Sequence, residues 1–290
     1  NLLLNGGGLF GTIKDSVWVK DLRFENPTLI LTADNKNNAG ILANAIQGGF
    51  TEDGVKIYAE LSNVHIINPV IVGRGYTQIV GGLVGDASLF MDVNTCSILN
   101  AEINAPQATV GALVGNLATG SSVHACVFTG KVSGAVVGGI AALIAGDTPV
   151  YDCRVDADLE GNNTIGGVVG YSDRAKVYNC FAQGTLTLDA KATIGKVGGI
   201  IGEIEPVVVD ATTKKDLDTK IVLSNCLVGI SESLIPAGQD IAAHRVAGFT
   251  GRDNYEYDWD NIDWDKDESE WPRIYGNPEK YMENNYVVSD

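Results

Sequence analysis

Acidic and aromatic residues crowd together near the C-terminal end of this 290-residue chain. The stretch from residue 252 to residue 270 holds nine acidic side chains and two basic ones. Five aromatic residues lie in or just after this stretch, namely Tyr255, Tyr257, Trp259, Trp264 and Trp271. Aromatic rings beside polar groups are typical of sugar-binding and protein-binding surfaces. We expect these five residues to form a binding patch, with the alternative that they fold over the end of the molecule as a cap.

The same acidic stretch contains part of a calcium-binding pattern. Asp263, Asp265 and Asp267 alternate as in the loop D-x-[DN]-x-[DN]-G. Glu268 replaces the glycine of that loop, and Ile274 takes its twelfth position. Weak calcium binding is therefore left open. The chain has no H-E-x-x-H or C-x-x-C motif, so we expect no metal site and no other cofactor.

A second group of charged residues has the types that act on carbohydrates. Asp156 and Asp158 alternate beside Arg154, so in a strand all three would point to one face. Glycoside hydrolysis uses two carboxyl groups ~5–9 Å apart. A solvated outer face explains the same residues without any chemistry. We therefore expect no catalytic residues and keep a carbohydrate-active enzyme, a polysaccharide lyase or hydrolase, as the alternative.

Most of the chain, including the charged residues 154–158, consists of a repeated sequence pattern. The phrase Gly-Gly-apolar-apolar-Gly occurs at residues 7–11, 81–85, 166–170 and 198–202, with looser copies between them. The steps from copy to copy are 32, 42, 30, 27, 28, 32 and 49 residues. Self-similarity at a period near thirty is the signature of a stacked-repeat protein. The longer steps indicate inserted loops, one of them at residues 43–61.

A second set of columns follows the glycine phrase. Five copies place a cysteine in one slot of the repeat, namely Cys96, Cys126, Cys153, Cys180 and Cys226. The residue before that slot is often Asn or Asp, as in Asn63, Asp152 and Asn179. These residue types tolerate a positive φ, so the column predicts a bend. Cysteines spaced with the repeat predict one buried ladder of free thiols, with a disulfide framework as the alternative.

Each repeat consists of short apolar–polar runs rich in Val, Ile and Thr, which predict strands. A unit of about thirty residues with sharp turns predicts an all-β fold, a right-handed parallel β-helix. We expect about seven or eight coils in residues 1–251, and an acidic, aromatic cap in residues 252–290, where the repeat is lost. The glycine phrase is expected to be the strand at which neighbouring backbones approach most closely. A β-propeller or a sandwich is the alternative fold.

The repeat resembles a known family. The phrase at residues 81–85, followed later by Val177-Tyr178-Asn179-Cys180 and a glycine-rich turn, is similar to the GLUG-motif repeats. The resemblance covers residues 1–251 and is strongest from residue 81 to residue 202. It implies a β-helix of the kind found in secreted and cell-surface bacterial proteins, among them adhesin-like proteins and stalks attached to peptidases. It implies no catalytic residue.

The composition limits the partners. A net charge of −16 opposes nucleic acid and anionic membrane surfaces, which require Lys and Arg. The longest uncharged apolar stretch, residues 132–146, is shorter than the ~20 residues that cross a bilayer, so we expect no transmembrane segment. We expect a non-enzymatic adhesin-like interaction module, extracellular or at the cell surface, that binds a host or cell-surface glycan or protein. A purely structural stalk is a further alternative.

Overall fold

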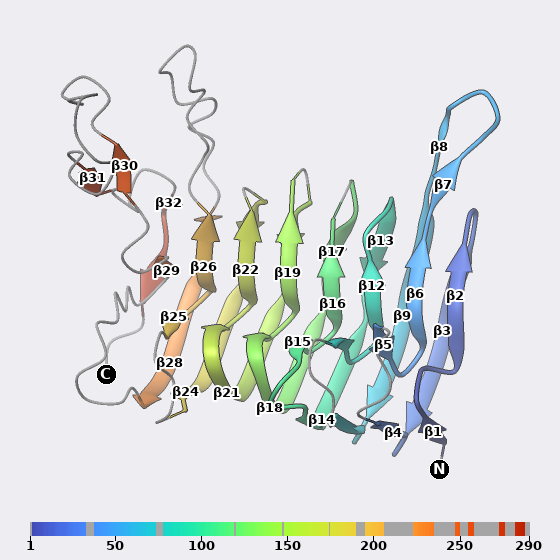
Figure 1. Ribbon diagram of the computed structural model, residues 1–290, viewed down its shortest axis with the longest axis horizontal. Helices are drawn as coiled ribbons and strands as arrows, with labels where there is room; N and C mark the ends of the chain where they lie inside the picture. The colour runs from blue at the N-terminus through green and yellow to red at the C-terminus, as the bar shows by residue number, and fades with distance from the viewer. Residues whose placement is uncertain are drawn as a thin grey trace, which may run out of the picture.

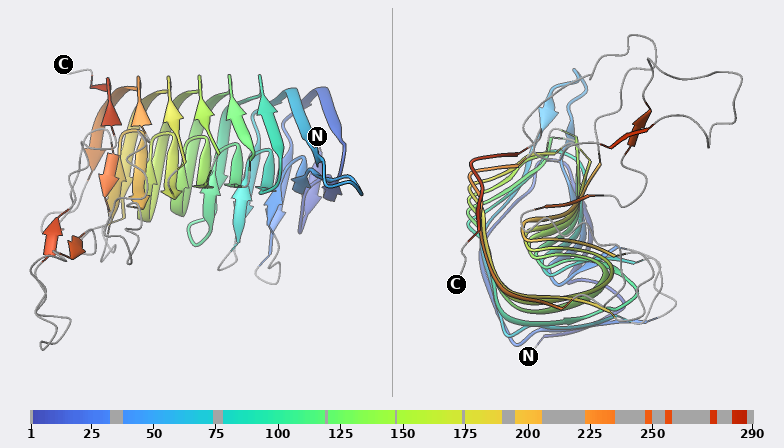
Figure 2. Two further views of the ribbon diagram at one scale, coloured as in Figure 1. Left: turned by 90° about the horizontal axis from the view of Figure 1, so that it is seen from above. Right: turned by 90° about the vertical axis from the view of Figure 1, so that its left-hand side faces the viewer.

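The structure is a computed structural model that describes residues 2–32, 38–73, 78–118, 120–146, 148–173, 175–189, 195–205, 223–234, 247–249, 255–257, 273–275 and 282–287. In these residues the chain is all β and has no helix. Short strands wind around one axis, and each coil stacks in parallel on the next (Figure 1, Figure 2). The predicted parallel β-solenoid is confirmed, while the number of coils and the cap stay predictions.

One wall of each coil belongs to a sheet that has eight strands in the described part of the chain. In spatial order these strands are β2 (Phe10–Lys14), β6 (Ala43–Gln47), β12 (Val84–Ala87), β16 (Val114–Leu117), β19 (Ala141–Ala145), β22 (Val169–Asp173), β26 (Ile201–Glu205) and β29 (Ala247–Phe249). Each strand continues the column of its neighbour, as the row of arrows in Figure 1 shows. The sheet therefore runs along the solenoid axis with one strand per coil.

The rest of each coil belongs to a second sheet that curves around the axis (Figure 2). Its longer strands are β3 (Trp18–Glu25), β9 (Ala59–Ile67), β14 (Ser97–Asn104), β18 (Val127–Gly138), β21 (Arg154–Gly166), β24 (Phe181–Leu188) and β28 (Leu227–Leu234). Its shorter strands are β1 (Leu3–Asn5), β4 (Thr28–Leu31), β5 (Ala39–Gly40), β10 (Val70–Gly73), β11 (Ile79–Gly81), β13 (Met91–Asn94), β15 (Thr109–Gly111), β17 (Ser122–His124), β20 (Val150–Tyr151), β23 (Val177–Tyr178), β25 (Lys196–Gly198), β27 (Leu223–Ser224), β32 (Met282–Glu283) and β33 (Tyr286–Val287).

Equivalent residues of successive coils lie side by side. Val123 pairs with Val150, Val150 with Val177, and Val177 with Leu223. These side chains point inward and are fully buried in one apolar core that runs along the axis. The five cysteines are also buried and free. The predicted ladder of buried free thiols is therefore confirmed.

The column before the cysteine slot forms the predicted bend. Its residues have φ values from 52° to 58°, namely Asp21, Asn63, Thr95, Ala125, Asp152, Asn179, Asn225 and Asn284. Side-chain amides link neighbours along this column, since Asn179 Nδ2 donates to Asp152 Oδ1 at 3.0 Å. Thr95 and Ala125 adopt the same left-handed conformation without the preference of Asn for it. The fold therefore imposes the bend even where the side chain does not favour it.

The glycine phrase spans a corner between two strands. Gly82 and Leu83 form a bend between β11 and β12, where the chain passes from one sheet to the other. A Cβ added to Gly82 would collide with the carbonyl oxygen of Ala112 in the next coil. At the equivalent corner, a Cβ on Gly166 would collide with the carbonyl oxygen of Val169. The predicted close approach of backbones is confirmed, but the phrase is not one strand, because it holds the end of β11, the bend and the start of β12.

The solenoid pattern also returns after residue 251. β32 pairs with β27, and β33 pairs with β28, both in parallel. Asn285 takes the slot that cysteine holds in the preceding coil. Its side chain accepts a hydrogen bond from the Cys226 backbone N–H at 2.9 Å and donates one to the Leu223 carbonyl oxygen at 3.1 Å. The repeat is therefore not lost throughout residues 252–290, and the domain boundary at residue 251 stays a prediction.

The insertion at residues 43–61 protrudes, as its length predicts. Strands β7 (Gly49–Phe50) and β8 (Lys56–Ile57) form an antiparallel hairpin that extends beyond the coils (Figure 1). The ring of Phe50 meets the buried ring of Phe90 edge to face, with centroids 5.0 Å apart. This contact anchors the hairpin to the body of the solenoid.

Candidate functional site

A cleft of about 390 Å³ lies on the outer surface over four successive coils. We call it the outer groove and define it by two rows of outward-facing side chains on β14, β18, β21 and β24. The first row consists of Glu102, Lys131, Asp158 and Thr185. The second row consists of Asn104, Ser133, Glu160 and Thr187. Parallel pairing brings these side chains, which are far apart in sequence, onto one surface.

Strand alternation explains why both rows face outward. Ile103, Val132 and Leu159 each lie between a first-row residue and a second-row residue, and each is only 2% exposed. These apolar side chains enter the core, so their polar neighbours must point to solvent, and the strand backbone between the two rows forms the floor of the outer groove. The rigid stacking of the coils therefore holds the polar rows at a spacing of ~4.8 Å along the axis.

The charges in the outer groove are unevenly partnered. Lys131 Nζ lies 3.6 Å from Asp158 Oδ2, and Thr185 Oγ1 donates a hydrogen bond to Asp158 Oδ1 at 2.7 Å. Within the part of the chain that the structure describes, the side chains of Glu102 and Glu160 have no hydrogen-bond or ion-pair partner. Three carboxylates and one ammonium group line the cleft, so the outer groove is acidic.

The charged residues that the sequence singles out lie on β21 but do not converge. The Arg154 guanidinium lies over the ring of Phe181, 5.6 Å from its centroid. Asp156 accepts a hydrogen bond from the side chain of Gln183. Asp158 alone of the three lines the outer groove. The expectation that the chain has no catalytic residues stays a prediction.

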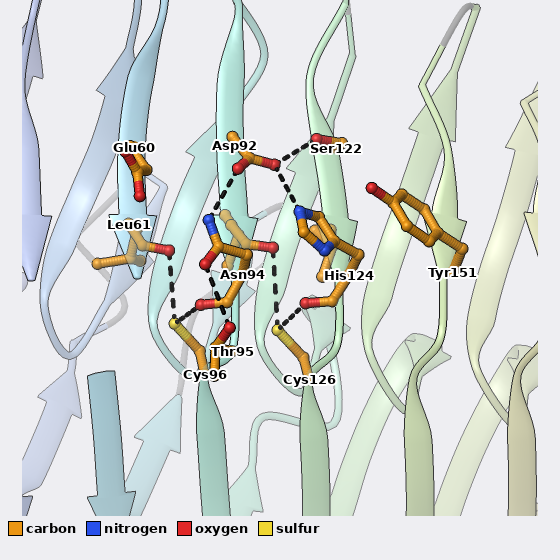
Figure 3. Close-up of polar contacts among 12 residues, drawn as sticks. Glu60, Leu61, Asp92, Asn94, Thr95, Cys96, Ser122, His124, Cys126 and Tyr151 are labelled. Carbon is orange, nitrogen blue, oxygen red and sulfur yellow. Dashed lines mark hydrogen bonds and ion pairs between the residues drawn. The ribbon is translucent and has the colours of Figure 1, made fainter. Parts of the chain in front are cut away.

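A Ser, His and Asp cluster lies on β13 and β17, which the bend column separates from the groove strands β14 and β18 (Figure 3). Ser122 Oγ donates to Asp92 Oδ1 at 2.6 Å, and His124 Nε2 lies 3.2 Å from the same oxygen. Asn94 Nδ2 donates to the other oxygen of Asp92 at 2.8 Å. In nucleophilic catalysis the serine must instead donate to the histidine. We therefore interpret this cluster as a polar ladder that ties neighbouring coils together.

The ladder continues as a stack of aromatic rings. The centroids of His124 and Tyr151 lie 4.7 Å apart, and those of Tyr151 and Tyr178 lie 4.9 Å apart, with nearly parallel planes. Burial raises the pKa of both tyrosine hydroxyl groups. Beneath this stack run the thiols, and Cys96 Sγ donates to the carbonyl oxygen of Asn94 at 3.1 Å (Figure 3).

Sequence reasoning missed both the aromatic stack and most of the outer groove. The stack had a clear signal, because His124, Tyr151 and Tyr178 each stand two residues before a cysteine of the ladder. The signal for the outer groove in the sequence was weaker. The register between β14 and β18 shifts near Asn100, so Glu102 lies one residue further from its cysteine than Lys131 does. Because of this shift, counting residues from each cysteine does not align Glu102 with Lys131.

The predicted aromatic patch lies mostly outside the described residues. Tyr255 and Tyr257 belong to strand β30 (Tyr255–Tyr257), which pairs with β31 (Arg273–Tyr275) in an antiparallel ladder. Their side chains, together with Trp259, Trp264 and Trp271, lie outside what the structure describes, as does the acidic run proposed for calcium. In the described residues no group of three or more His, Cys, Asp or Glu side chains is placed to hold a metal ion.

Comparison with known proteins gives one family finding. Residues 161–187 match the model of the GLUG motif. This segment comprises the end of β21, the following corner, β22, β23 and most of β24, which amounts to one coil of the solenoid. No curated protein and no solved structure matches the chain. The resemblance to GLUG repeats is thus confirmed for this coil and is consistent with a GLUG-repeat family.

The described part of the chain contains no helix that is long and apolar enough to span a membrane.

Proposed function

We propose that this protein is a non-enzymatic, adhesin-like interaction module on the outside of a bacterium, and that its outer groove binds a glycan chain. The observation that carries the proposal is the pair of polar rows held open to solvent on a rigid solenoid. The side chains of Glu102, Asn104, Ser133, Glu160 and Thr187 have no hydrogen-bond partner among the described residues, so the fold does not use their polar side-chain atoms. The GLUG motif at residues 161–187 supports the bacterial surface or secreted setting through the resemblance.

A glycan fits the outer groove better than a peptide does. The groove crosses the strands, so a bound peptide would find side chains there and no strand edge for backbone pairing. Its apolar residues turn their side chains into the core, so they offer no exposed apolar surface for an anchor residue of a protein partner. Hydroxyl, amide and carboxylate groups in two rows match instead a ligand with hydroxyl groups along its whole length.

A carbohydrate-active enzyme is the second candidate, because Asp158 and Glu160 face the same cleft from one strand. Two observations make it the weaker one. Asp158 is already engaged by Lys131 and by Thr185. Its side chain is also 51% exposed, whereas carboxyl groups that act as general acids are shielded from water. A purely structural stalk is the third candidate and predicts no ligand at all.

Native electrophoresis through gels cast with different polysaccharides separates these candidates. We expect the protein to be retarded by at least one polysaccharide without degrading it, and a Glu102→Gln/Glu160→Gln double variant to migrate freely in the same gel. A Glu25→Gln/Glu52→Gln variant has the same net charge, with changes at two exposed sites away from the outer groove, and should be retarded like the parent.

Staining the same gels for sugar tests the alternatives. A cleared zone around the parent protein would contradict the non-enzymatic proposal and favour the Asp158 and Glu160 pair. Free migration in every gel would contradict the glycan-binding proposal and leave a protein partner or a stalk. Retardation that the groove variant does not relieve would move the binding site elsewhere, with the aromatic residues from Tyr255 to Trp271 as the next region to mutate.

A further inference from the structure

The pattern of charge in the outer groove narrows the class of glycan. We propose that the outer groove selects a glycan that carries free amino groups, such as a chain of glucosamine units, over neutral and anionic chains. This inference rests on the proposed glycan-binding function. It depends on the partnering of the groove's four charged side chains, Glu102, Lys131, Asp158 and Glu160.

The single ammonium group of the outer groove lies beside a carboxylate of the same groove. Lys131 Nζ lies 3.6 Å from Asp158 Oδ2, and Asp158 is held further by Thr185. This pair forms an electrically balanced centre in the middle of the cleft. A sulfate, phosphate or uronate group that approached Lys131 would therefore have to compete with Asp158 and would also meet the carboxylates of Glu102 and Glu160.

Two carboxylates flank that centre and remain unpaired among the described residues. Glu102 lies in the first row on β14, and Glu160 lies in the second row on β21, two coils further along the axis. Strands ~4.8 Å apart separate the two positions by roughly 10 Å along the groove. Both glutamates are exposed, so a ligand can reach them without any rearrangement of the chain.

The geometry suits a polymer that places positive charge at regular intervals. A protonated amine on a sugar can donate a charge-assisted hydrogen bond to a carboxylate, and such bonds are roughly twice as strong as those between neutral groups. Asn104, Ser133 and Thr187 remain available for the hydroxyl groups of the same chain. The net charge of −16 adds long-range attraction for a cationic chain and repulsion for an anionic one.

Isothermal titration calorimetry with two matched probes tests this selectivity. The probes are the hexasaccharide of glucosamine and its fully N-acetylated counterpart, at neutral pH or slightly below and physiological ionic strength. We expect the free-amine hexasaccharide to bind about tenfold more tightly. At alkaline pH, where the sugar amine loses its proton, the two affinities should converge.

Three variants locate the selectivity. Glu102→Gln and Glu160→Gln should each reduce affinity for the free-amine probe about threefold, so that together they account for the tenfold preference, and leave affinity for the N-acetylated probe almost unchanged. Glu52→Gln, at the exposed tip of the β7–β8 hairpin, removes the same charge outside the outer groove and should have no effect. All three substitutions are at exposed positions, and unchanged melting temperatures would show that the variants are folded.

The outcomes separate this inference from the function on which it rests. Equal affinity for both probes, or preference for the N-acetylated one, would overturn amine selection while glycan binding stands. An equal loss in Glu52→Gln would assign the attraction to overall charge and overturn the groove as the selective site. Failure of both hexasaccharides to bind, together with free migration in every polysaccharide gel, would overturn the glycan-binding function itself.

Discussion

The strands of the outer groove, β14, β18, β21 and β24, carry the same type of residue in every coil on their inner face and different types on their outer face. On the inner face of the groove strands the stacked residues are all apolar and buried, namely Ile103, Val132, Leu159 and Leu186. On the outer face the stacked neighbours change chemical type at every step, namely Glu102, Lys131, Asp158 and Thr185. The backbone register nevertheless continues unchanged through these residues. Inner columns therefore specify the solenoid, and outer columns are free to specify a ligand.

The corner glycines should give the largest stability effect on the inner side. A Cβ on Gly166 would collide with the carbonyl oxygen of Val169 and approach the backbone nitrogen of Gly202, at 2.5 Å. Both obstacles are backbone atoms, so no side chain can move aside. We expect Gly166→Ala to lower the free energy of unfolding by about 4 kcal/mol, above the usual cost of overpacking. Chemical denaturation of the variant and the parent measures this difference.

Gly11 supplies the matched control for that substitution. A Cβ at Gly11, in strand β2, would meet no heavy atom within 4 Å. Gly11→Ala should therefore change the free energy of unfolding by no more than about 0.5 kcal/mol. If both alanine variants lost the same stability, the corner would not be a point of close approach.

Adjacent residues of β21 test the comparison between the two faces directly. Leu159 is 2% exposed in the core, whereas Glu160, the next residue, is exposed in the outer groove. Leu159→Ala should cost about 3 kcal/mol in unfolding free energy, because it removes buried surface and leaves a cavity. Glu160→Ala should cost less than about 0.5 kcal/mol and act on ligand binding alone. A large stability loss in Glu160→Ala would show that the outer row also holds the fold.

The inner columns could be predicted from the sequence because every coil repeats the same physical requirement. The bend at Asn63 and Asn179 and the burial of the cysteine slot follow from residue types that recur at one position. The corner at Gly82 was predicted wrongly as a strand, since small residues suit a tight turn and a close strand equally well. A repeated pattern thus revealed where backbones meet, but not the direction in which the chain turns there.

The outer groove could not be predicted in the same way. Its residues differ in charge and type between coils, so they leave no periodic signal, and only Asp158 was singled out. The register shift near Asn100 then offsets Glu102 from the residues that stack on it. The return of the solenoid at β32 and β33 did leave a signal, because Asn284 and Asn285 occupy the bend column and the cysteine slot.

The bend column, which lies just before the cysteine slot, differs from both faces. Its residues are exposed like the charged residues of the outer groove, but the backbone conformation restricts which residue types suit it. Ala125 has a φ of 52°, a left-handed conformation that costs an L-residue ~1–2 kcal/mol and that Asn tolerates better. We expect Ala125→Asn to raise the free energy of unfolding by about 1 kcal/mol. Denaturation curves test this gain, with Ala118→Asn, a partly exposed residue without a positive φ, as the control. No gain at position 125 would mean that the bend is relaxed for alanine.

The smallest expected effect concerns the aromatic stack on the outer face. Burial raises the pKa of Tyr151 and of Tyr178 in the folded state. The unfolded chain therefore releases these phenolic protons first, as pH rises through the ordinary tyrosine value of ~10. The stability that the neutral phenols contribute is complete below that pH and is lost as pH rises through the folded pKa.

The double variant Tyr151→Phe/Tyr178→Phe isolates this contribution from that of the other groups that titrate at alkaline pH. It should lose stability less steeply than the parent as pH rises past ~10, and the two proteins should have parallel profiles at neutral pH. Thermal melts across this pH range supply the measurement, and ultraviolet titration of the phenolate supplies the two pKa values. Identical profiles at every pH would contradict the burial of the phenols. The hydroxyl groups of the stack would then contribute as little to the stability of the fold as the side chains of the outer groove do.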